Sequence, residues 1–299
     1  MKALIKKAAG KIPLIGNWYQ QTQQQGAYPP GHFYSPVPDA QEVERYLDRR
    51  AGGADDEIPG INLNADHQFS LLKEYSGWYS QLEFPERQQA GKRYWYENGF
   101  FSYADAIFLH GFLCKHRPQR IIEVGSGFSS AAILDVVDSQ GLQSTELTFI
   151  EPYPERLNSL LSATDKQSAR VVVDQVQAVP LAEFARLQAG DLLFIDSSHV
   201  VKCGSDLQYL LFEVLPALAS GVFVHFHDVF YPFEYPPEWL RKGRYWNENY
   251  FLRAFLAHNV AWSIYFFNTY VARKFADFIS DELPLCQRNP GGSLYIRKQ

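Results

Sequence analysis

The stretch from Arg120 to Ser130 reads RIIEVGSGFSS, and it decides the fold that we expect for this chain. It begins with a short apolar run, which favours a buried strand, and Gly125 and Gly127 interrupt that run. The residues that follow the second glycine are typical of the first turn of a helix. The stretch therefore predicts a strand, a glycine turn and a helix N-terminus, which is the first βα unit of a nucleotide-binding α/β sheet.

The position of Glu123 narrows the choice of ligand for this turn. Glu123 stands two residues before the first glycine, and Ser130 occupies the third glycine position of the dinucleotide pattern G-x-G-x-x-G. A carboxylate so close would repel the pyrophosphate of NAD, whereas it would attract the cationic amino-acid end of S-adenosylmethionine. The turn therefore favours S-adenosylmethionine over NAD. A plain βα turn with a solvated glutamate is the alternative interpretation.

The size and composition of the chain favour one catalytic domain with an N-terminal extension. With 299 residues, 46% of them hydrophobic, the chain can bury a large core. We expect an arm and helical extension over residues 1–92 and an S-adenosylmethionine-binding domain over residues 93–299. The formal net charge of −5 argues against a protein that binds nucleic acid through phosphate contacts.

The cysteines and the first residues bear on the cellular compartment. Cys114, Cys203 and Cys286 are odd in number and scattered, which favours a reducing cytoplasm over a disulfide framework or a zinc site. No apolar run approaches the roughly 18 residues of a membrane span. The start, MKALIKKAAGKIPLIG, lacks the uninterrupted apolar region of a signal peptide. Its apolar spacing predicts a frayed or docked terminal helix, with a helix that touches a membrane or a partner as the alternative.

The rest of the chain alternates between apolar runs and helical patterns, which predicts a mostly parallel, seven-stranded α/β sheet flanked by helices. A capping box is expected at Ser102 and Asp105. The expected strands are 120–124, 147–150, 170–173, 192–195, 222–226, 262–267 and 293–296. The expected helices are 40–50, 66–81, 102–118, 129–137, 154–161, 180–187, 205–218, 250–258 and 270–279.

Acidic residues end several of these strands. In an open parallel sheet ligands bind beyond the carboxyl ends of the strands, so Glu123, Glu151, Asp196 and Asp228 are expected on one rim. Glu151 has the position that accepts both ribose hydroxyls, with a solvated helix-opening glutamate as the alternative. Asp174 and Gln175, after the third strand, are expected to reach an adenine edge, with a simple turn aspartate as the alternative.

A second cluster follows strands four and five. Asp196, His227 and Asp228 supply the ligand types of a divalent cation such as Mg²⁺ or Mn²⁺, which would hold substrate oxygens and lower a hydroxyl pKa. A metal-free polar wall is an equally supported interpretation. His199 is placed to act as the general base for that hydroxyl, or else it caps or packs. His225 is expected in the core.

An aromatic and proline-rich run, FYPFEYPPEW, occupies Phe230 to Trp239. Its stiff, flat side chains suit a substrate lid or a surface on which sugars stack, and a well-packed loop is the alternative. Arg241, Lys242 and Arg244 are expected to meet an anionic substrate or to be solvated.

Four stretches together resemble a known family: IIEVGSGFSS, FIEPYPERL, DLLFIDSSHV and HFHDVFYPFEYP. Over Tyr94 to Phe267 the chain is similar to class I S-adenosylmethionine-dependent methyltransferases, and more narrowly to methyltransferase family 24. The resemblance implies a Rossmann-like fold. The cofactor-binding residues that we expect are Glu123, Gly125, Ser126, Gly127, Phe128, Glu151, Pro152, Asp174 and Asp196.

Related sugar O-methyltransferases imply further roles. They place a metal on acids that end strands four and five and use a histidine after the strand-four acid as the base. Asp196, Asp228 and His199 match that pattern, with Asp196 and His199 as the expected catalytic residues. His227 departs from the pattern, because those relatives usually have an acid there.

The expected function is methyl transfer to a hydroxyl of a sugar or another polyol, ahead of a small aromatic hydroxyl. The expected partner is a small-molecule or glycan acceptor, and a homo-oligomer stays open. Two rival functions remain. One is an NAD-dependent oxidoreductase, and the other is a non-catalytic cofactor-fold protein that acts as a partner in polysaccharide assembly.

Overall fold

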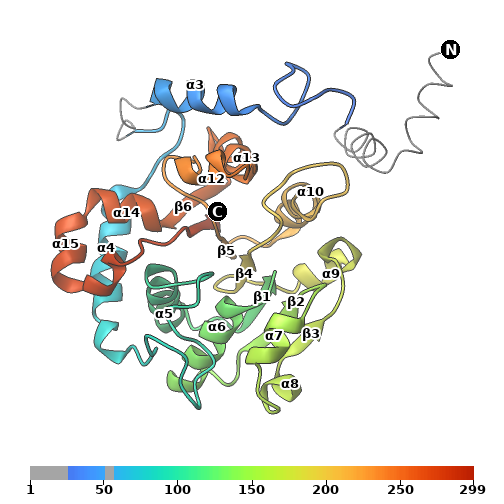
Figure 1. Cartoon of the computed structure of the whole chain (residues 1–299). Helices are drawn as coiled ribbons and strands as arrows, with labels where there is room; N and C mark the ends of the chain where they lie inside the picture. Colours follow the sequence, from blue (N-terminus) through green and yellow to red (C-terminus); the bar gives the residue numbers. More distant parts are fainter. Residues whose placement is uncertain (1–25, 51–56) are drawn as a thin grey trace. The chain divides into compact units, whose positions relative to one another are not determined.

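The structure is a computed structural model that describes residues 26–50 and 57–299 (Figure 1). It divides into two compact units. The larger comprises Asp56–Glu234 and Trp246–Gln299, and the smaller comprises the residues before 56 together with Tyr235–Tyr245. The boundary that we expected after residue 92 falls within the larger unit. The terminal helix expected near the start of the chain lies outside the described residues.

The larger unit is built on one seven-stranded sheet in the order β3-β2-β1-β4-β5-β7-β6. All neighbouring pairs from β3 to β5 are parallel, and β7 is antiparallel to both β5 and β6. The strands are β1 (Arg120–Val124), β2 (Glu146–Ile150), β3 (Arg170–Val172), β4 (Leu192–Ile195), β5 (Phe223–Phe226), β6 (Trp262–Phe267) and β7 (Leu294–Lys298). The predicted mostly parallel seven-stranded sheet is confirmed.

The register of the central strands explains why their ends meet. Val124 of β1 pairs with Ile150 of β2 and with Ile195 of β4, and Ile195 pairs with Phe226 of β5. The four strands therefore end level with one another. Strands β4 and β5 are buried throughout, which is typical of a parallel sheet covered by helices.

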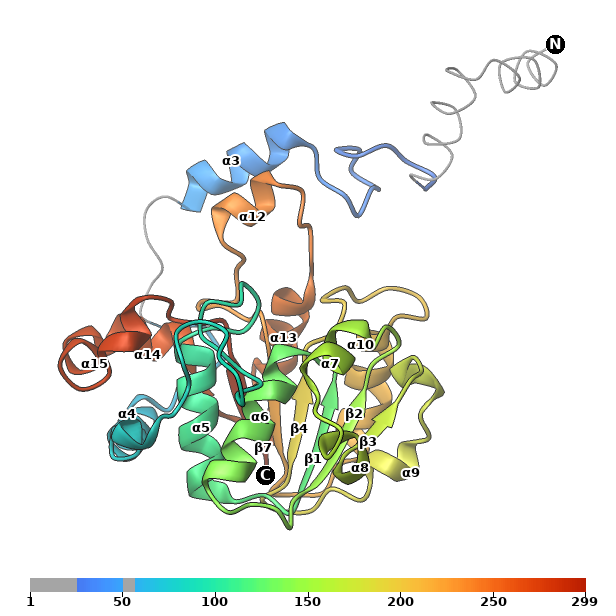
Figure 2. The ribbon, with the colours of Figure 1, turned by 60° about the horizontal axis from the view of Figure 1, so that its bottom comes forward.

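Helices cover this sheet, and Figure 2 shows α5 and α6 side by side on one face. The longer helices of the larger unit are α4 (Ala65–Ser76), α5 (Ala104–His116), α6 (Phe128–Ser139), α13 (Glu248–Leu256), α14 (Asn268–Lys274) and α15 (Ala276–Glu282). The shorter ones are α7 (Glu155–Leu160), α8 (Asp165–Ser168), α9 (Leu181–Phe184), α10 (Asp206–Tyr209) and α11 (Leu215–Ala217). No helix among the described residues is both long and apolar enough to span a membrane.

Several predicted helices differ from the structure, among them the one expected over 270–279, which is divided into α14 and α15. The helix expected over 205–218 is divided by a π-helical turn at Leu210–Val214, directly before the short α11 that contains Pro216. Proline has no N–H to continue the regular hydrogen-bond ladder, which accounts for the irregular turn. The helix expected over 180–187 is a single turn, α9.

The predicted capping box at Ser102 and Asp105 is wrong. Helix α5 begins at Ala104 after Tyr103, whose φ is 42°, and no side chain caps it. Asp105 is instead buried, and its Oδ1 accepts hydrogen bonds from the N–H of Gly292, the hydroxyl of Ser293 and the amide of Asn268. A carboxylate that serves three donors from the β7 and α14 region is held by tertiary structure, which a local pattern does not reveal.

The smaller unit contains α3 (Ala40–Arg50) and α12 (Pro237–Arg241), which pack together. Arg241 forms a two-pronged ion pair with Glu44, at 2.9 Å and 3.0 Å. The guanidinium of Arg244 lies 4.5 Å from the ring centroid of Trp239. Two of the cations considered for an anionic substrate therefore have protein partners within this unit.

Candidate active site

The glycine turn after β1 connects two strand ends. Gly125 has a φ of +80°, and a side chain there would collide with the backbone carbonyl of Asp196 at the end of β4. The N–H of Asp196 in turn donates to the carbonyl of Val124, at 2.8 Å. Gly127 has an extended backbone with a φ of −178°, and an added Cβ would lie 3.3 Å from the flexible side chain of Arg156. Of these two glycines, Gly125 is therefore the one that the fold itself requires.

Glu123 lies beneath this turn and is fully buried. One carboxyl oxygen accepts from the hydroxyl of Ser130, which itself accepts from the N–H of Gly127 at 3.0 Å. The other oxygen has no hydrogen-bond partner among the described residues. Burial raises the pKa of Glu123 to about 8, with the neighbouring serine hydroxyls opposing the rise. At neutral pH this carboxyl is therefore mostly neutral in the ligand-free protein.

Glu151, at the end of β2, faces the same turn from the other side. Its Oε2 accepts from the N–H of Ser126 at 3.0 Å, and its Oε1 accepts from the N–H of Tyr153 at 2.8 Å. These bonds fix the carboxylate at the rim, with lone pairs left to accept further hydrogen bonds. Its neighbour Tyr153 is a large exposed aromatic side chain.

A cavity of about 590 Å³ opens at this rim, within the range of small-molecule sites. Of the expected cofactor residues, Gly125, Glu151, Pro152 and Asp196 line it. Glu123, Ser126, Gly127, Phe128 and Asp174 do not. The other lining residues are Val124, Ile150, Tyr153, Gln175, Val176, Gln177, Ser197, Ser198, Lys202, Gly204, Ser205 and Asp206.

The described residues around the cavity fit the adenosine part of S-adenosylmethionine. Glu151 supplies carboxylate oxygens for ribose hydroxyls, and Val176 and Ile150 supply apolar surface for a base. The hydroxyl of Ser197, which lines the cavity, is buried without a hydrogen-bond partner among the described residues. Unmet polar groups at the edge of a cavity are what a polar ligand would satisfy.

Beside the cavity, Asp196 joins two histidines. Its Oδ1 lies 3.5 Å from Nε2 of His199 and 3.5 Å from Nδ1 of His227. Asp228 completes the cluster, with Oδ2 3.6 Å from Nε2 of His199 and Oδ1 3.8 Å from Nδ1 of His227. Burial would raise the pKa of Asp196, but the charges of His227 and His199 outweigh burial and lower it. Asp196 thus lines the cavity and contacts this cluster.

His199 is the best-defined member of the cluster. It is buried, and its Nδ1 lies 2.8 Å from Oε2 of Glu248. Burial disfavours the charged imidazolium, yet the Glu248 hydrogen bond and the charges of Asp196 and Asp228 outweigh burial and raise the pKa of His199. His199 has a φ of 59° and Asp228 a φ of 58°, so both hold the left-handed conformation that is uncommon outside glycine.

His227 is held from its other side by Asp105, whose Oδ2 lies 3.6 Å from Nε2. Burial lowers the pKa of His227, but the charges of Asp228, Asp196 and Asp105 outweigh it and hold the pKa well above its usual value. His227 thus lies between Asp105 on one side and Asp196 and Asp228 on the other.

The metal prediction for Asp196, His227 and Asp228 does not fit this arrangement. Across residues 26–50 and 57–299, no group of three or more His, Cys, Asp or Glu side chains is arranged to hold a metal ion. In this cluster the carboxylates pair with imidazoles instead.

Other predicted residues have structural roles. His225 is fully buried and its ring stacks on Phe194 with centroids 3.8 Å apart, and burial holds its pKa well below its usual value. Phe233, in the aromatic run, is buried and packs near Phe267. It is a core residue, whereas a lid or a stacking surface would need it exposed.

Two residues of the cluster escaped sequence reasoning. Glu248 lies before the expected helix 250–258, and an acid near the start of a helix is ordinary because it favours the helix dipole. Asp105 appeared to be part of a helix cap. In the sequence, Asp105 stands between Ala104 and Ala106 in an apolar helical pattern, and this was the available signal that the acid is buried. All three residues are buried in the structure.

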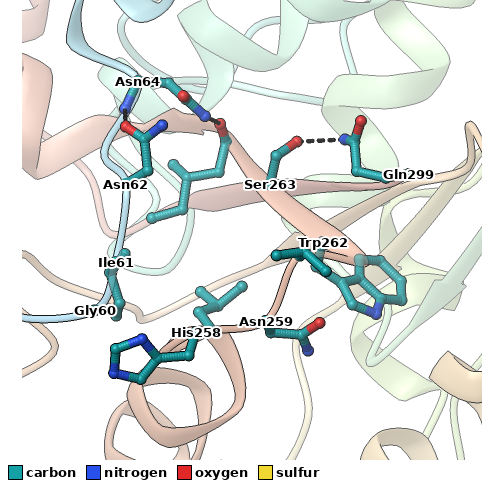
Figure 3. Close-up of a pocket in the computed structure, with 12 residues that line it drawn as sticks. Gly60, Ile61, Asn62, Asn64, His258, Asn259, Trp262, Ser263 and Gln299 are labelled. Carbon is teal, nitrogen blue, oxygen red and sulfur yellow. Dashed lines mark hydrogen bonds between the residues drawn. The ribbon is translucent and has the colours of Figure 1, made fainter.

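A second cavity, of about 380 Å³, lies at the start of β6 and the end of β7 (Figure 3). Several of its polar side chains are bonded to the protein: Asn64 donates to the carbonyl of Ile264, and Gln299 donates to Ser263. Because β6 runs in the same direction as β4 and β5, its start lies at the opposite end of the strands from Glu151 and Asp196. We assign it no ligand.

The chain is similar to known proteins in sequence and in structure. Residues 122–229 match the family 24 model that is described as a methyltransferase domain. An uncharacterised protein of Archaeoglobus fulgidus is 34% identical over 167 residues, which is 54% of this chain and 74% of that protein. The chain belongs to this methyltransferase family, and it is an S-adenosylmethionine-dependent methyltransferase with the Rossmann-like class I fold.

Solved structures with low sequence identity are also similar to this chain. The SAH-bound methyltransferase PaMTH1 of Podospora anserina has a TM-score of 0.41 and 14% identity, covering 88% of this chain and 98% of that one. A methyltransferase from Geobacter sulfurreducens has a TM-score of 0.35 and 13% identity, covering 87% and 97%.

Proposed function

We propose that this methyltransferase methylates a hydroxyl group of a sugar or another small polyol, with His199 as the general base. The observation that carries this proposal is the position of His199. Its Nδ1 is bonded to a buried glutamate, and its Nε2 faces two carboxylates, one of which lines the cavity. A base that can take a proton from oxygen and is fixed in orientation is what transfer to a hydroxyl requires.

S-adenosylmethionine supplies an electrophilic methyl group when it is bound. Among the described residues, we assign ribose binding to Glu151 and the wall around the adenosine to the residues after β3 and β4. Glu123, Ser126 and Gly127 would lie near the methionine part. Asp174 lies outside the cavity lining, and we assign the adenine edge to Gln175 and Val176.

The protein's part in the reaction is orientation and proton transfer. Asp196 and Asp228 accept hydrogen bonds from neighbouring acceptor hydroxyls and align one of them with Nε2 of His199. His199 then takes the hydroxyl proton as the oxygen attacks the methyl carbon. The carboxylates beside His199 stabilise the imidazolium that results.

Paired carboxylates favour a hydroxyl-rich acceptor. Vicinal hydroxyls can donate to two adjacent carboxylates at once, whereas a phosphate or carboxylate on the acceptor would be repelled by Asp196 and Asp228. This is why we place neutral sugars and polyols before small aromatic hydroxyls.

The need for a cation stays a prediction. The carboxylates and imidazoles here pair with one another, so no step above depends on Mg²⁺ or Mn²⁺. A chelator should leave turnover unchanged if this arrangement is the active one, and loss of turnover that Mg²⁺ or Mn²⁺ restores would assign Asp196 and Asp228 to a metal.

The direct test is a transfer assay with isotope-labelled methyl donor against a panel of free sugars, methyl glycosides, nucleotide sugars and catechols. Labelled product from a sugar, with the label in an O-methyl ether, supports the proposal. Product from catechols alone, or from amines, would overturn the acceptor class.

The non-catalytic interaction function makes a different prediction for the same assay, namely cofactor binding or none at all, but no transfer to any acceptor. We also propose a reducing compartment such as the cytoplasm. The support for it is that Cys114, Cys203 and Cys286 are all free thiols.

A further inference from the structure

Glu248 is an ionisable residue in an unusual place. It is the first residue of α13, its exposed fraction is 1%, and its Oε2 lies 2.8 Å from Nδ1 of His199. Its Oε1 has no hydrogen-bond partner among the described residues. Burying a carboxylate costs free energy unless a partner compensates, and the partner here is one imidazole nitrogen.

The backbone at the start of α13 is hydrogen-bonded to the same histidine. The N–H groups of Asn247 and Glu248 both donate to the carbonyl of His199, at 3.1 Å and 3.2 Å. The Asn247 side chain accepts from the N–H of Val201 at 2.7 Å and donates to its carbonyl at 3.2 Å. The start of α13 is thus fastened to the loop that carries His199.

The ring of His199 is also held from the side. The Trp246 ring lies against it with centroids 4.3 Å apart and an interplanar angle of 34°. Trp246 therefore limits the rotation of the imidazole ring. Because Nδ1 is bonded to Glu248, Nε2 points toward Asp196 and Asp228.

We propose that Glu248 is a positioning residue: it accepts the Nδ1–H of His199 and so fixes the tautomer whose Nε2 lone pair faces the acceptor hydroxyl. The inference rests on the function proposed above. A neutral imidazole has one N–H and one lone pair, so a bond at Nδ1 leaves Nε2 as the proton acceptor.

This tautomer serves the transfer of the methyl group to the acceptor oxygen. The acceptor O–H bond breaks and its proton moves to Nε2, the acceptor oxygen bonds the methyl carbon, and the carbon–sulfur electron pair returns to sulfur. The sulfonium becomes a neutral thioether, and His199 becomes an imidazolium between Glu248, Asp196 and Asp228 until solvent takes the proton.

The tautomer can be tested without knowing the acceptor. In ¹⁵N-histidine-labelled full-length protein at a pH where His199 is neutral, NMR should show the proton on Nδ1. Glu248→Gln keeps an oxygen acceptor and should retain that tautomer. Glu248→Ala should give a mixture of tautomers or a proton on Nε2. In all three proteins the calorimetric affinity for S-adenosylhomocysteine should stay within about threefold, since Glu248 does not line the cofactor cavity.

The matched control is Asn247→Ala, which removes the two side-chain hydrogen bonds to the backbone of Val201 but leaves the carboxylate of Glu248. It should keep the wild-type tautomer. A proton on Nε2 in the wild type, or a wild-type tautomer in Glu248→Ala, would overturn the positioning role.

Failure of this inference differs from failure of the proposed function. If His199→Ala keeps full turnover, the base assignment fails, whatever the tautomer. If His199→Ala loses turnover while the tautomer does not depend on Glu248, only the positioning role fails.

Discussion

The Oε2 atom of Glu151, at the end of β2, accepts a hydrogen bond of 3.0 Å from the N–H of Ser126 in the turn after β1. This bond ties the two strand ends that frame the cavity. It also holds the carboxylate at the place where a ribose would lie. The same side chain thus supports the turn and, in our account, binds the cofactor.

Glu151→Ala should weaken S-adenosylhomocysteine binding by on the order of 2 kcal/mol, because a charged hydrogen-bond acceptor is lost. That corresponds to roughly 30-fold in Kd by calorimetry. Glu151→Gln keeps the bond to Ser126 and should lose less. Unchanged affinity in Glu151→Ala would remove the ribose role.

Gly125 and Gly127 should respond differently to alanine. Gly125→Ala forces a side chain into the Asp196 carbonyl at a positive φ, so the free energy of unfolding should fall by more than about 1 kcal/mol. Gly127→Ala has an extended backbone and only a flexible arginine in the way, so denaturant melts should show little change. Equal destabilisation of the two variants would contradict the assignment of Gly125 as the required glycine.

Cofactor binding should release a proton from Glu123. Its pKa is raised to about 8 by burial, so below pH 8 the free protein holds it mostly protonated. An ammonium group of the ligand nearby would favour the ionised form. Calorimetry in buffers of different ionisation enthalpy should detect release of up to one proton at pH 7. Glu123→Gln should abolish that release, and wild-type binding with no proton exchange would place Glu123 outside the cofactor site.

Turnover should require neutral His199. Its pKa is raised above 6.5 because Glu248, Asp196 and Asp228 favour the imidazolium more than burial disfavours it. A base must be unprotonated to work, so kcat/KM should rise with pH and level off above that raised pKa. Loss of the Glu248 charge should move the acid limb to lower pH. A profile without an acid limb near or above pH 6.5 would contradict the base assignment.

The strands and the acidic rim could be predicted from the sequence. Buried parallel strands are short continuous apolar runs, and their ends must meet at one edge, so Glu151, Asp196 and Asp228 were placed correctly by topology. Gly125 was also correct, although its reason is contact with the Asp196 backbone more than access for a ligand.

The partners of the histidines could not be predicted. Glu248 meets His199 only because α13 folds back onto the loop after β4, and Asp105 meets His227 from the start of α5. Such contacts join residues far apart in sequence, and the local pattern gave Glu248 no role and assigned Asp105 to a cap. The charge facing the ligand at Glu123 was likewise overestimated, because the sequence did not show that this carboxyl would be buried beneath the turn.

The most direct test of the account compares His199→Ala and His199→Gln with the wild type, measuring transfer of labelled methyl and S-adenosylhomocysteine affinity on the same preparations. Removal of a general base should lower kcat by about 10²- to 10⁴-fold, while the affinity stays within about threefold. Turnover near the wild-type rate in either variant would contradict the central claim that His199 takes the acceptor's proton.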